Sequence, residues 1–144
     1  MMPARTVVIF ACVQNAGRSQ MAAAFFNELA DPAAARAISA GTRPASRVHP
    51  EVVEAMREVG FDLSTAQPQL LTSALAAGAG LLITMGCGES CPVVPGLEVR
   101  DWQVEDPGGQ NPDGVRRIRD EIRGRVKELI GSEGWDRKPA RQVP

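Results

Sequence analysis

The sequence predicts an α/β fold in which helices cover both faces of a parallel β-sheet. Four strand-like apolar runs alternate along the chain with segments whose apolar residues recur at helical spacing, and this alternation is typical of βαβ units. The length of 144 residues, with 44% hydrophobic and 23% charged residues, indicates one globular domain that can bury its own core. We place this domain at residues 1–131 and expect residues 132–144 to form a polar, mobile tail.

The first three elements are predicted from the N-terminal third of the chain. Residues 6–12 are expected to form a strand, because a run of β-branched and apolar side chains ends there at Cys12. A helix is expected after Gly17, since apolar residues then recur at helical spacing: Met21, Phe25 and Leu29. Residues 36–42 are predicted as the second strand, which ends near Gly41.

The middle of the chain continues this alternation. His49 is expected to lead into a helix, since Pro50 fits the first helical position and Gly60 fits the C-terminal cap. The remaining elements predicted here are a helix at residues 67–77, a strand at residues 81–83 and a strand at residues 97–102.

The last predicted helix has a distinct start signal. Asn111 is its expected N-cap and Pro112 its first residue. An apolar stripe then follows one face of the helix, formed by Val115, Ile118, Ile122 and Leu129. We expect the helix to end at Gly131.

A strand, a turn and a helix follow one another around Cys12 and Arg18, which form the pattern C-x5-R. The backbone N–H groups of such a turn gather at a helix N-terminus, where they bind oxyanions. Arg18 adds a planar fork of donors that matches a tetrahedral anion, and the positive surroundings favour the thiolate form of Cys12. The alternative is a buried packing cysteine beside a solvated arginine. We favour an oxyanion-binding loop made of Val13, Gln14, Asn15, Ala16, Gly17, Arg18 and Ser19.

The stretch CVQNAGRS at residues 12–19 resembles the phosphate loop of the low-molecular-weight tyrosine phosphatase superfamily. Three further stretches resemble its arsenate reductase branch: SAGT at residues 39–42, TMGCGESCP at residues 84–92 and DWQVEDPGGQ at residues 101–110. The similarity runs from about Val7 to Ile130. It implies a Rossmann-like, three-layer domain with a four-stranded parallel sheet of the low-molecular-weight tyrosine phosphatase type. It also implies arsenate as the substrate, with phosphate and sulfate as competing oxyanions.

Binding sites of parallel α/β sheets lie beyond the carboxyl ends of the strands, and this rule brings Cys12 and Asp106 to one edge. A carboxyl group at Asp106 can protonate an oxygen that leaves the atom held above Cys12. An Asp before Pro107 is also typical of an ordinary turn, but the resemblance favours the acid. The resemblance further implies that Asn15 hydrogen-bonds to Ser39 and so braces the loop.

Cys87 and Cys91 follow the third predicted strand in a glycine-flanked loop at the same edge. A zinc site needs more ligands than these two, and the sequence has one His and three Cys, so no metal is predicted. Two packing cysteines are the alternative, although a glycine-flanked loop near solvent suits buried hydrophobes poorly. Three cysteines are too few for a disulfide scaffold and, in a reducing compartment, indicate redox or catalytic roles. We therefore favour a disulfide relay with Cys12.

The resemblance implies a thiol-dependent arsenate reductase that serves arsenic detoxification. Cys12 attacks arsenate held by Arg18, Ser19 and the loop amides. Cys87 then attacks the Cys12 sulfur, and Cys91 passes the oxidation outward. The expected external reductant is a thioredoxin-like protein or a small thiol such as mycothiol or bacillithiol, with no bound cofactor.

Two other functions are compatible with these residues. A protein tyrosine or small-molecule phosphatase would use the same Cys12, Arg18 and Asp106. The sequence has no Tyr, however, and Gly108-Gly109 stand where family phosphatases carry aromatic residues that hold an aryl substrate. A non-catalytic phosphocysteine carrier would leave Asp106 without a role.

The net charge of −1 gives no electrostatic basis for binding nucleic acid or an anionic membrane. The sequence contains no apolar run of membrane-spanning length, and its N-terminus lacks the pattern of a signal peptide. We therefore expect a cytoplasmic protein, and a monomer.

Overall fold

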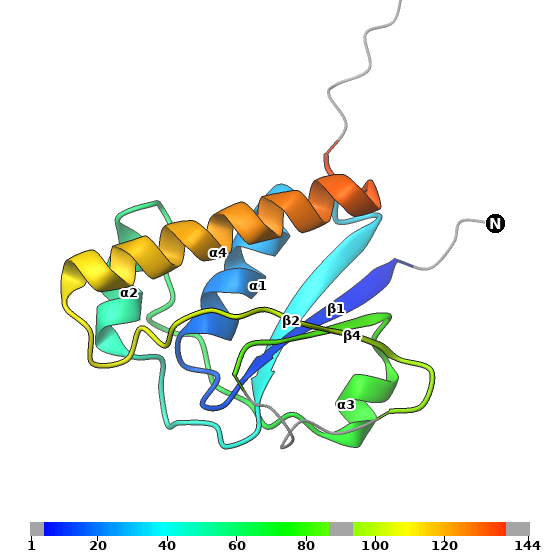
Figure 1. Cartoon of the computed structure of the whole chain (residues 1–144), viewed down its shortest axis with the longest axis horizontal. Helices are drawn as coiled ribbons and strands as arrows, with labels where there is room; N and C mark the ends of the chain where they lie inside the picture. Colours follow the sequence, from blue (N-terminus) through cyan, green and yellow to red (C-terminus); the bar gives the residue numbers. More distant parts are fainter. Residues whose placement is uncertain (1–4, 87–93, 138–144) are drawn as a thin grey trace, which may run out of the picture.

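The computed structural model describes residues 5–86 and 94–137, which fold around one parallel β-sheet. The sheet contains β1 (Thr6–Cys12), β2 (Ala35–Gly41), β3 (Leu81–Thr84) and β4 (Glu98–Asp101). Their order across the sheet is β2-β1-β3-β4, and every neighbouring pair is parallel (Figure 1). The predicted α/β fold with a four-stranded parallel sheet is confirmed.

The interior strand β1 explains why an almost continuous apolar run occurs near the N-terminus. It pairs with β2 on one side and with β3 on the other, and Phe10 lies opposite both Ser39 and Ile83. Because successive side chains point to opposite faces, Phe10 enters the larger core while Ile9 enters a smaller one. A strand buried on both faces needs apolar residues at every position.

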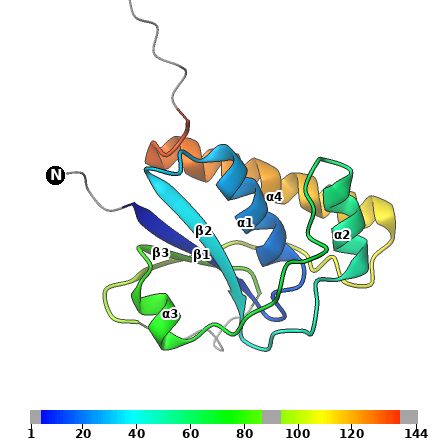
Figure 2. The same ribbon diagram turned by 180° about the vertical axis from the view of Figure 1, so that it is seen from behind.

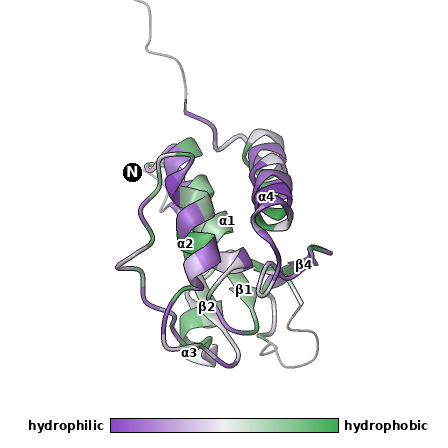
Figure 3. Ribbon diagram, turned by 90° about the vertical axis from the view of Figure 1, so that its left-hand side faces the viewer, coloured by the Kyte–Doolittle hydropathy of each residue, from purple (hydrophilic) through white to green (hydrophobic). Residues whose placement is uncertain are grey.

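Helices cover both faces of the sheet, as Figures 1 and 2 show. On one face lie α1 (Arg18–Leu29), α2 (Pro50–Arg57) and α4 (Pro112–Glu133), which enclose the larger core. The short α3 (Ser73–Ala77) covers the other face. Figure 3 shows that α4 is largely hydrophilic outside, whereas β1 and α1 are mostly hydrophobic. In the part of the chain that the structure describes, no helix combines the length and the apolar character needed to cross a membrane.

The start of α4 is confirmed, but its predicted end at Gly131 is wrong. The helix continues to Glu133, and Gly134 takes the left-handed conformation (φ 73°) that ends it. Trp135 then packs edge-to-face on Phe26 with ring centroids 5.9 Å apart. Residues 132–137, which we expected in a mobile tail, therefore belong to the folded structure, because an aromatic contact holds them against α1.

Two helices in the middle of the chain are shorter than predicted. The helix α2 ends at Arg57, and Gly60 (φ 92°) lies in the turn beyond it. Of the helix predicted at residues 67–77, only α3 forms, from the N-cap Thr72 onward. The preceding residues are extended because they pair with the end of β2: the N–H of Gly41 donates to Gln69, and its carbonyl accepts from Leu71.

A charged cluster fastens α2 to α4. The Arg119 guanidinium, almost fully buried, donates to the carbonyl of Ala55 and to Glu58, both at 2.8 Å. Arg116 donates to the same carboxylate at 2.8 Å. Hydrogen bonds from Arg116 and then from Arg119 lower the pKa of Glu58 from 4.5 to about 2. The cluster matters for function because α2 begins beside the site described below.

This pKa shift predicts how acid affects stability. Since the folded protein releases the Glu58 proton at a lower pH than the unfolded chain does, the stabilisation is complete above about pH 4.5 and disappears as the pH falls toward about 2. Urea midpoints of Glu58→Gln are expected to depend less on pH in this window than wild-type midpoints. Glu28→Gln is the matched control, because among the described residues no ion pair involves Glu28. Parallel curves for wild type and Glu58→Gln would contradict the assignment.

Candidate active site

The Cys12 loop, residues 12–19, lies where β1 ends and α1 begins. Cys12 is the last residue of the strand and only 2% exposed, while Arg18 is the first residue of the helix. The loop therefore wraps the N-terminus of α1 around the sulfur, which brings backbone N–H groups and the helix dipole toward it. Cys12 Sγ lies 2.9 Å from Ser19 Oγ, which is fully buried beneath the loop.

Asn15 holds the Cys12 loop in shape. It is fully buried and has a left-handed backbone (φ 51°), which Asn tolerates better than most residues. Its Nδ2 donates to Ser19 Oγ at 2.8 Å, and its Oδ1 accepts from the N–H of Gln69 at 2.9 Å. The Gln20 side chain donates to the Asn15 carbonyl at 3.0 Å. The side-chain amide of Asn15 thus hydrogen-bonds the loop both to α1 and to the segment after β2.

The predicted hydrogen bond between Asn15 and Ser39 is wrong. Gln69 stands between them: its N–H donates to Asn15, and its side-chain Nε2 donates to the carbonyl of Ser39 at 2.9 Å. The physical reason is that the segment after β2 pairs with Gly41 and so brings Gln69 over the loop. Sequence reasoning missed Gln69, since its role depends on a pairing between distant residues.

Gly41 at the end of β2 lets the second strand approach the Cys12 loop. A Cβ atom there would lie 2.6 Å from the Val13 carbonyl oxygen and 2.8 Å from the Asn15 nitrogen. Both are backbone atoms, so the loop itself would have to move. In the native chain, Arg43 donates its N–H to the Val13 carbonyl at 2.8 Å, which fixes the loop from outside.

Replacing Gly41 by alanine is expected to destabilise the fold by about 1–3 kcal/mol through overpacking. It should also weaken sulfate binding roughly tenfold to a hundredfold, because displaced loop amides lose hydrogen bonds to a charged ligand. Gly124→Ala is the control, since nothing lies within 4 Å of a Cβ atom at this position in α4; it should stabilise the helix by roughly 0.5–1 kcal/mol. Calorimetry of both variants checks the pair, and normal sulfate affinity in Gly41→Ala would contradict the close approach.

Arg18 connects the Cys12 loop to the loops that follow β3 and β4. Its side chain is only 11% exposed, and its Nη1 donates to the carbonyl of Val104 at 3.1 Å. Its Nη2 lies 3.9 Å from Asp106 Oδ2. A Cβ atom on Gly86, which has φ 90°, would lie 2.7 Å from Nη1. The left-handed backbone favours glycine at this position, and a larger residue would also displace the guanidinium.

Asp106 forms the turn that the sequence offered as one alternative, and its carboxyl group also lies beside Arg18. Its Oδ1 accepts the N–H of Gly108 at 2.9 Å, as in an ordinary Asx turn. Its Oδ2 faces Arg18, and the side chain is 60% exposed. Pro107 packs beside Gly17, with its Cγ 3.0 Å from the position of a Gly17 Cβ. The turn thus holds one carboxyl oxygen and leaves the other toward the Cys12 loop.

These groups surround a cavity of about 220 Å³, which we call the Cys12 hollow. The residues that line it are Cys12, Val13, Gln14, Ala16, Gly17, Arg18, His49 and Asp106. The structure therefore brings together the predicted thiol, guanidinium and carboxyl group. His49 was predicted only to lead into α2, and it is indeed the N-cap of that helix, but its side chain also lines the hollow. Its position before a helix at the carboxyl edge of the sheet was the available signal.

The model of the low molecular weight phosphotyrosine protein phosphatase family matches residues 7–139. The chain belongs to this family. The resemblance predicted from the Cys12 loop and from three downstream stretches is thereby confirmed.

Several relatives of this chain are named as arsenate reductases and not as phosphatases. A Halobacterium salinarum protein, provisionally assigned as an arsenate reductase, is 43% identical over 127 residues, which cover 84% of this chain and 88% of the relative. The glutaredoxin arsenate reductase of Synechocystis is 36% identical over 126 residues, which cover 85% and 95%. A thioredoxin-dependent arsenate reductase of Corynebacterium glutamicum superposes with a TM-score of 0.78 at 39% identity over 92% of this chain, which spans 63% of that protein.

The two remaining predicted site residues of this phosphatase-family chain, Cys87 and Cys91, lie outside the described residues. The strand before them, β3, runs parallel to β1 and ends at the edge where Cys12 lies. The predicted relay therefore rests on the sequence and on this topology.

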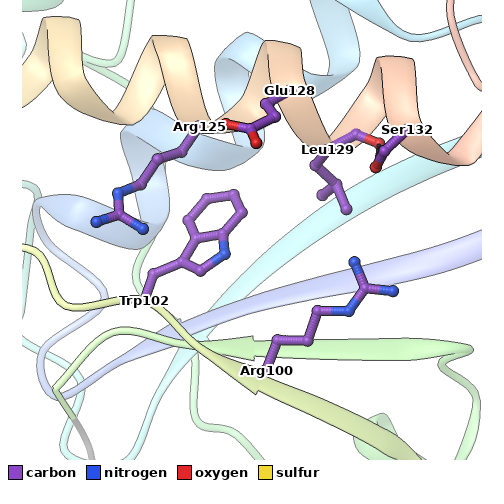
Figure 4. A pocket seen from close by; sticks show the side chains of 6 residues that line it. All are labelled: Arg100, Trp102, Arg125, Glu128, Leu129 and Ser132. Carbon is purple, nitrogen blue, oxygen red and sulfur yellow. Dashed lines mark hydrogen bonds between the residues drawn. The ribbon is translucent and has the colours of Figure 1, made fainter.

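A second cavity, of about 210 Å³, lies between β4 and α4 (Figure 4). Its lining residues are Arg100, Trp102, Arg125, Glu128, Leu129 and Ser132. The cations in it already have partners: Arg100 pairs with Glu98 and Glu133, which raises its pKa, and Arg125 pairs with Glu121. The Cys12 hollow, which also holds a nucleophile, is therefore the better candidate for chemistry.

Proposed function

We propose that this chain is a thiol-dependent arsenate reductase. The observation that carries the proposal is the Cys12 hollow, in which a buried sulfur faces a guanidinium and a carboxyl group across a cavity of about 220 Å³. That volume suits a small tetrahedral anion. The names of relatives at 36–43% identity support arsenate as that anion.

In the first proposed step, the Cys12 thiolate attacks the arsenic atom of bound arsenate. The hydroxyl of Ser19, 2.9 Å from Sγ, is placed to donate to the thiolate. Arg18 and the loop amides stabilise the oxygens, and Asp106 gives its proton to the oxygen that leaves as water. A sulfur–arsenic bond forms and an arsenic–oxygen bond breaks.

In the second step, a thiolate attacks the Cys12 sulfur. A sulfur–sulfur bond forms, the sulfur–arsenic bond breaks, and its two electrons reduce As(V) to As(III), which leaves as arsenite. We assign this thiolate to Cys87, and we propose that Cys91 then carries the disulfide outward. A thioredoxin-like protein or a small thiol would restore the dithiol in the cytoplasm, where glutathione and thioredoxin keep thiols reduced. The proposed role is arsenic detoxification by a monomer.

A phosphatase would use the same hollow but needs a wall for its aryl group. Apart from chain neighbours, no described atom lies within 4 Å of a Cβ position at Gly109, and the atoms nearest to a Cβ position at Gly108 belong to Asp106 and His49. This open side favours a small inorganic anion over a phosphotyrosine side chain.

The test is arsenite release measured with a thioredoxin system and, separately, with small thiols, beside an aryl phosphate assay. In the relay, Cys12→Ser releases nothing and Cys87→Ser releases nothing. Cys91→Ser releases one equivalent per chain and stops as a Cys12–Cys87 disulfide, because nothing remains to resolve it. If a small thiol is the direct reductant, Cys87→Ser and Cys91→Ser both keep turning over with it. Hydrolysis of aryl phosphate without arsenate reduction would overturn the proposal.

A further inference from the structure

His49 is the one titratable group among the residues that line the Cys12 hollow to which the steps above give no task. It precedes Pro50 at the start of α2, and its N–H donates to the Ala16 carbonyl at 3.0 Å. Ala16 belongs to the Cys12 loop, so the first residue of the α2 region is bound directly to it. The ion pairs of Glu58 with Arg116 and Arg119 hold the other end of α2 on α4, so the helix is fixed at both ends.

The imidazole ring of His49 lies between the Cys12 loop and the loop after β4. Measured to the position of a Cβ atom, its Cδ2 is 3.7 Å from Gly17 and 3.7 Å from Gly108. Its Nε2 is 3.4 Å from the Gly108 position, and Asp106 Oδ1 is 3.2 Å from that same point. The far end of the ring and Asp106 Oδ1 therefore lie close to one point beside Gly108, and both residues line the hollow.

The charged groups that face His49 come from α1, from the loop after β4 and from α2 itself. Arg18 faces it from α1, but one guanidinium nitrogen is engaged by Val104. Asp106 faces it from the loop after β4, and Glu51 of α2 accepts the N–H of Gly109 at 3.4 Å. The loop after β4 and the start of α2 thus bring a carboxyl group and an imidazole to the hollow, and of these two only the imidazole can offer an N–H.

We propose that His49 is a further substrate-contacting residue: its Nε2–H donates a hydrogen bond to the oxygen of the bound oxyanion that faces Asp106. In the proposed reaction this is the oxygen that leaves as water. As the arsenic–oxygen bond breaks, negative charge builds on that oxygen, and the imidazole N–H stabilises it while Asp106 delivers the proton. The role in catalysis rests on the proposed function, but the hydrogen bond itself requires only a tetrahedral anion.

Sulfate binding to Cys12→Ser protein tests this contact without any chemistry. Calorimetry compares His49 with His49→Gln, whose amide nitrogen can occupy the place of Nε2, and with His49→Asn and His49→Leu, which cannot reach it. We expect His49→Gln to stay within about twofold of His49, and Asn and Leu to bind sulfate roughly three- to tenfold more weakly. Glu54→Gln, on α2 but outside the hollow, is the matched control and should bind normally.

Equal sulfate affinity in all four proteins would overturn the proposal. Equal weakening in all three His49 variants, Gln included, would also overturn it, since it would show that the ring only packs between the two loops. Thermal midpoints check that each variant folds, and either Asn or Leu suffices as the non-donating variant. If the expected affinities appear but the protein with Cys12 intact does not reduce arsenate, the arsenate reductase proposal fails and the His49 contact stands.

Discussion

Replacing Arg18 by lysine is expected to lower arsenate turnover about 10²–10³-fold, although the positive charge is kept. A lysine ammonium cannot reproduce the planar fork that donates to two oxygens at once. It would also lose the hydrogen bond to Val104, which positions the loop that carries Asp106. The measurement is kcat/KM for arsenate reduction, together with the sulfate affinity, which should fall as well.

Arg57→Lys is the matched control for this change. Arg57 is a surface residue of α2 that pairs only weakly with Glu54 at 3.2 Å, and its side chain is 64% exposed. Turnover of this variant should equal that of wild type. Near-normal turnover of Arg18→Lys at saturating arsenate would show that the guanidinium is not part of the anion site.

Asp106→Asn is expected to slow formation of the covalent Cys12 intermediate about 10²–10⁴-fold. The amide has no acidic proton to give to the departing oxygen. Its Oδ1 can still accept the N–H of Gly108, so the turn should persist and sulfate affinity should change little. Single-turnover arsenite release, measured with excess enzyme, separates this step from regeneration.

Glu105→Gln controls for the loss of a neighbouring negative charge. The Glu105 carboxylate binds Gln110 and Arg117 rather than the Cys12 hollow, so the variant should react at the wild-type rate. An unchanged single-turnover rate in Asp106→Asn would return Asp106 to the role of a turn residue.

The elements that carry the site could be predicted because their signals are local. The apolar run that ends at Cys12 is the interior strand, and the helix begins directly after Gly17. Asn111 caps α4 by accepting the N–H of Gly114 at 2.8 Å, which its place before Pro112 indicates. The parallel order of the strands then brings Cys12 and Asp106 to one edge without any knowledge of their contacts.

The features that the sequence did not predict depend on contacts between distant residues. Gln69 reaches Asn15 only because its segment pairs with Gly41, and a helical pattern concealed that pairing. His49 looks like a helix-entry residue until the loop after β4 folds against it. The end of α4 lies at Gly134 and not at Gly131, and the chain beyond it places the Trp135 ring on the first helix. In each case the local pattern allows several outcomes, and tertiary packing selects one.

The parallel topology also determines when during folding the thiol of Cys12 acquires its surroundings. The interior strand β1 pairs with two strands that follow it in the chain. Parallel neighbours require long crossovers, and such non-local pairings form slowly because the ends of each loop must meet before contacts compensate for the lost entropy. A nascent chain emerging from the ribosome presents Cys12 long before Asp106 has been synthesised. We expect the hollow around the thiol to be completed only when the last strand joins the sheet, because the loop after that strand carries Asp106.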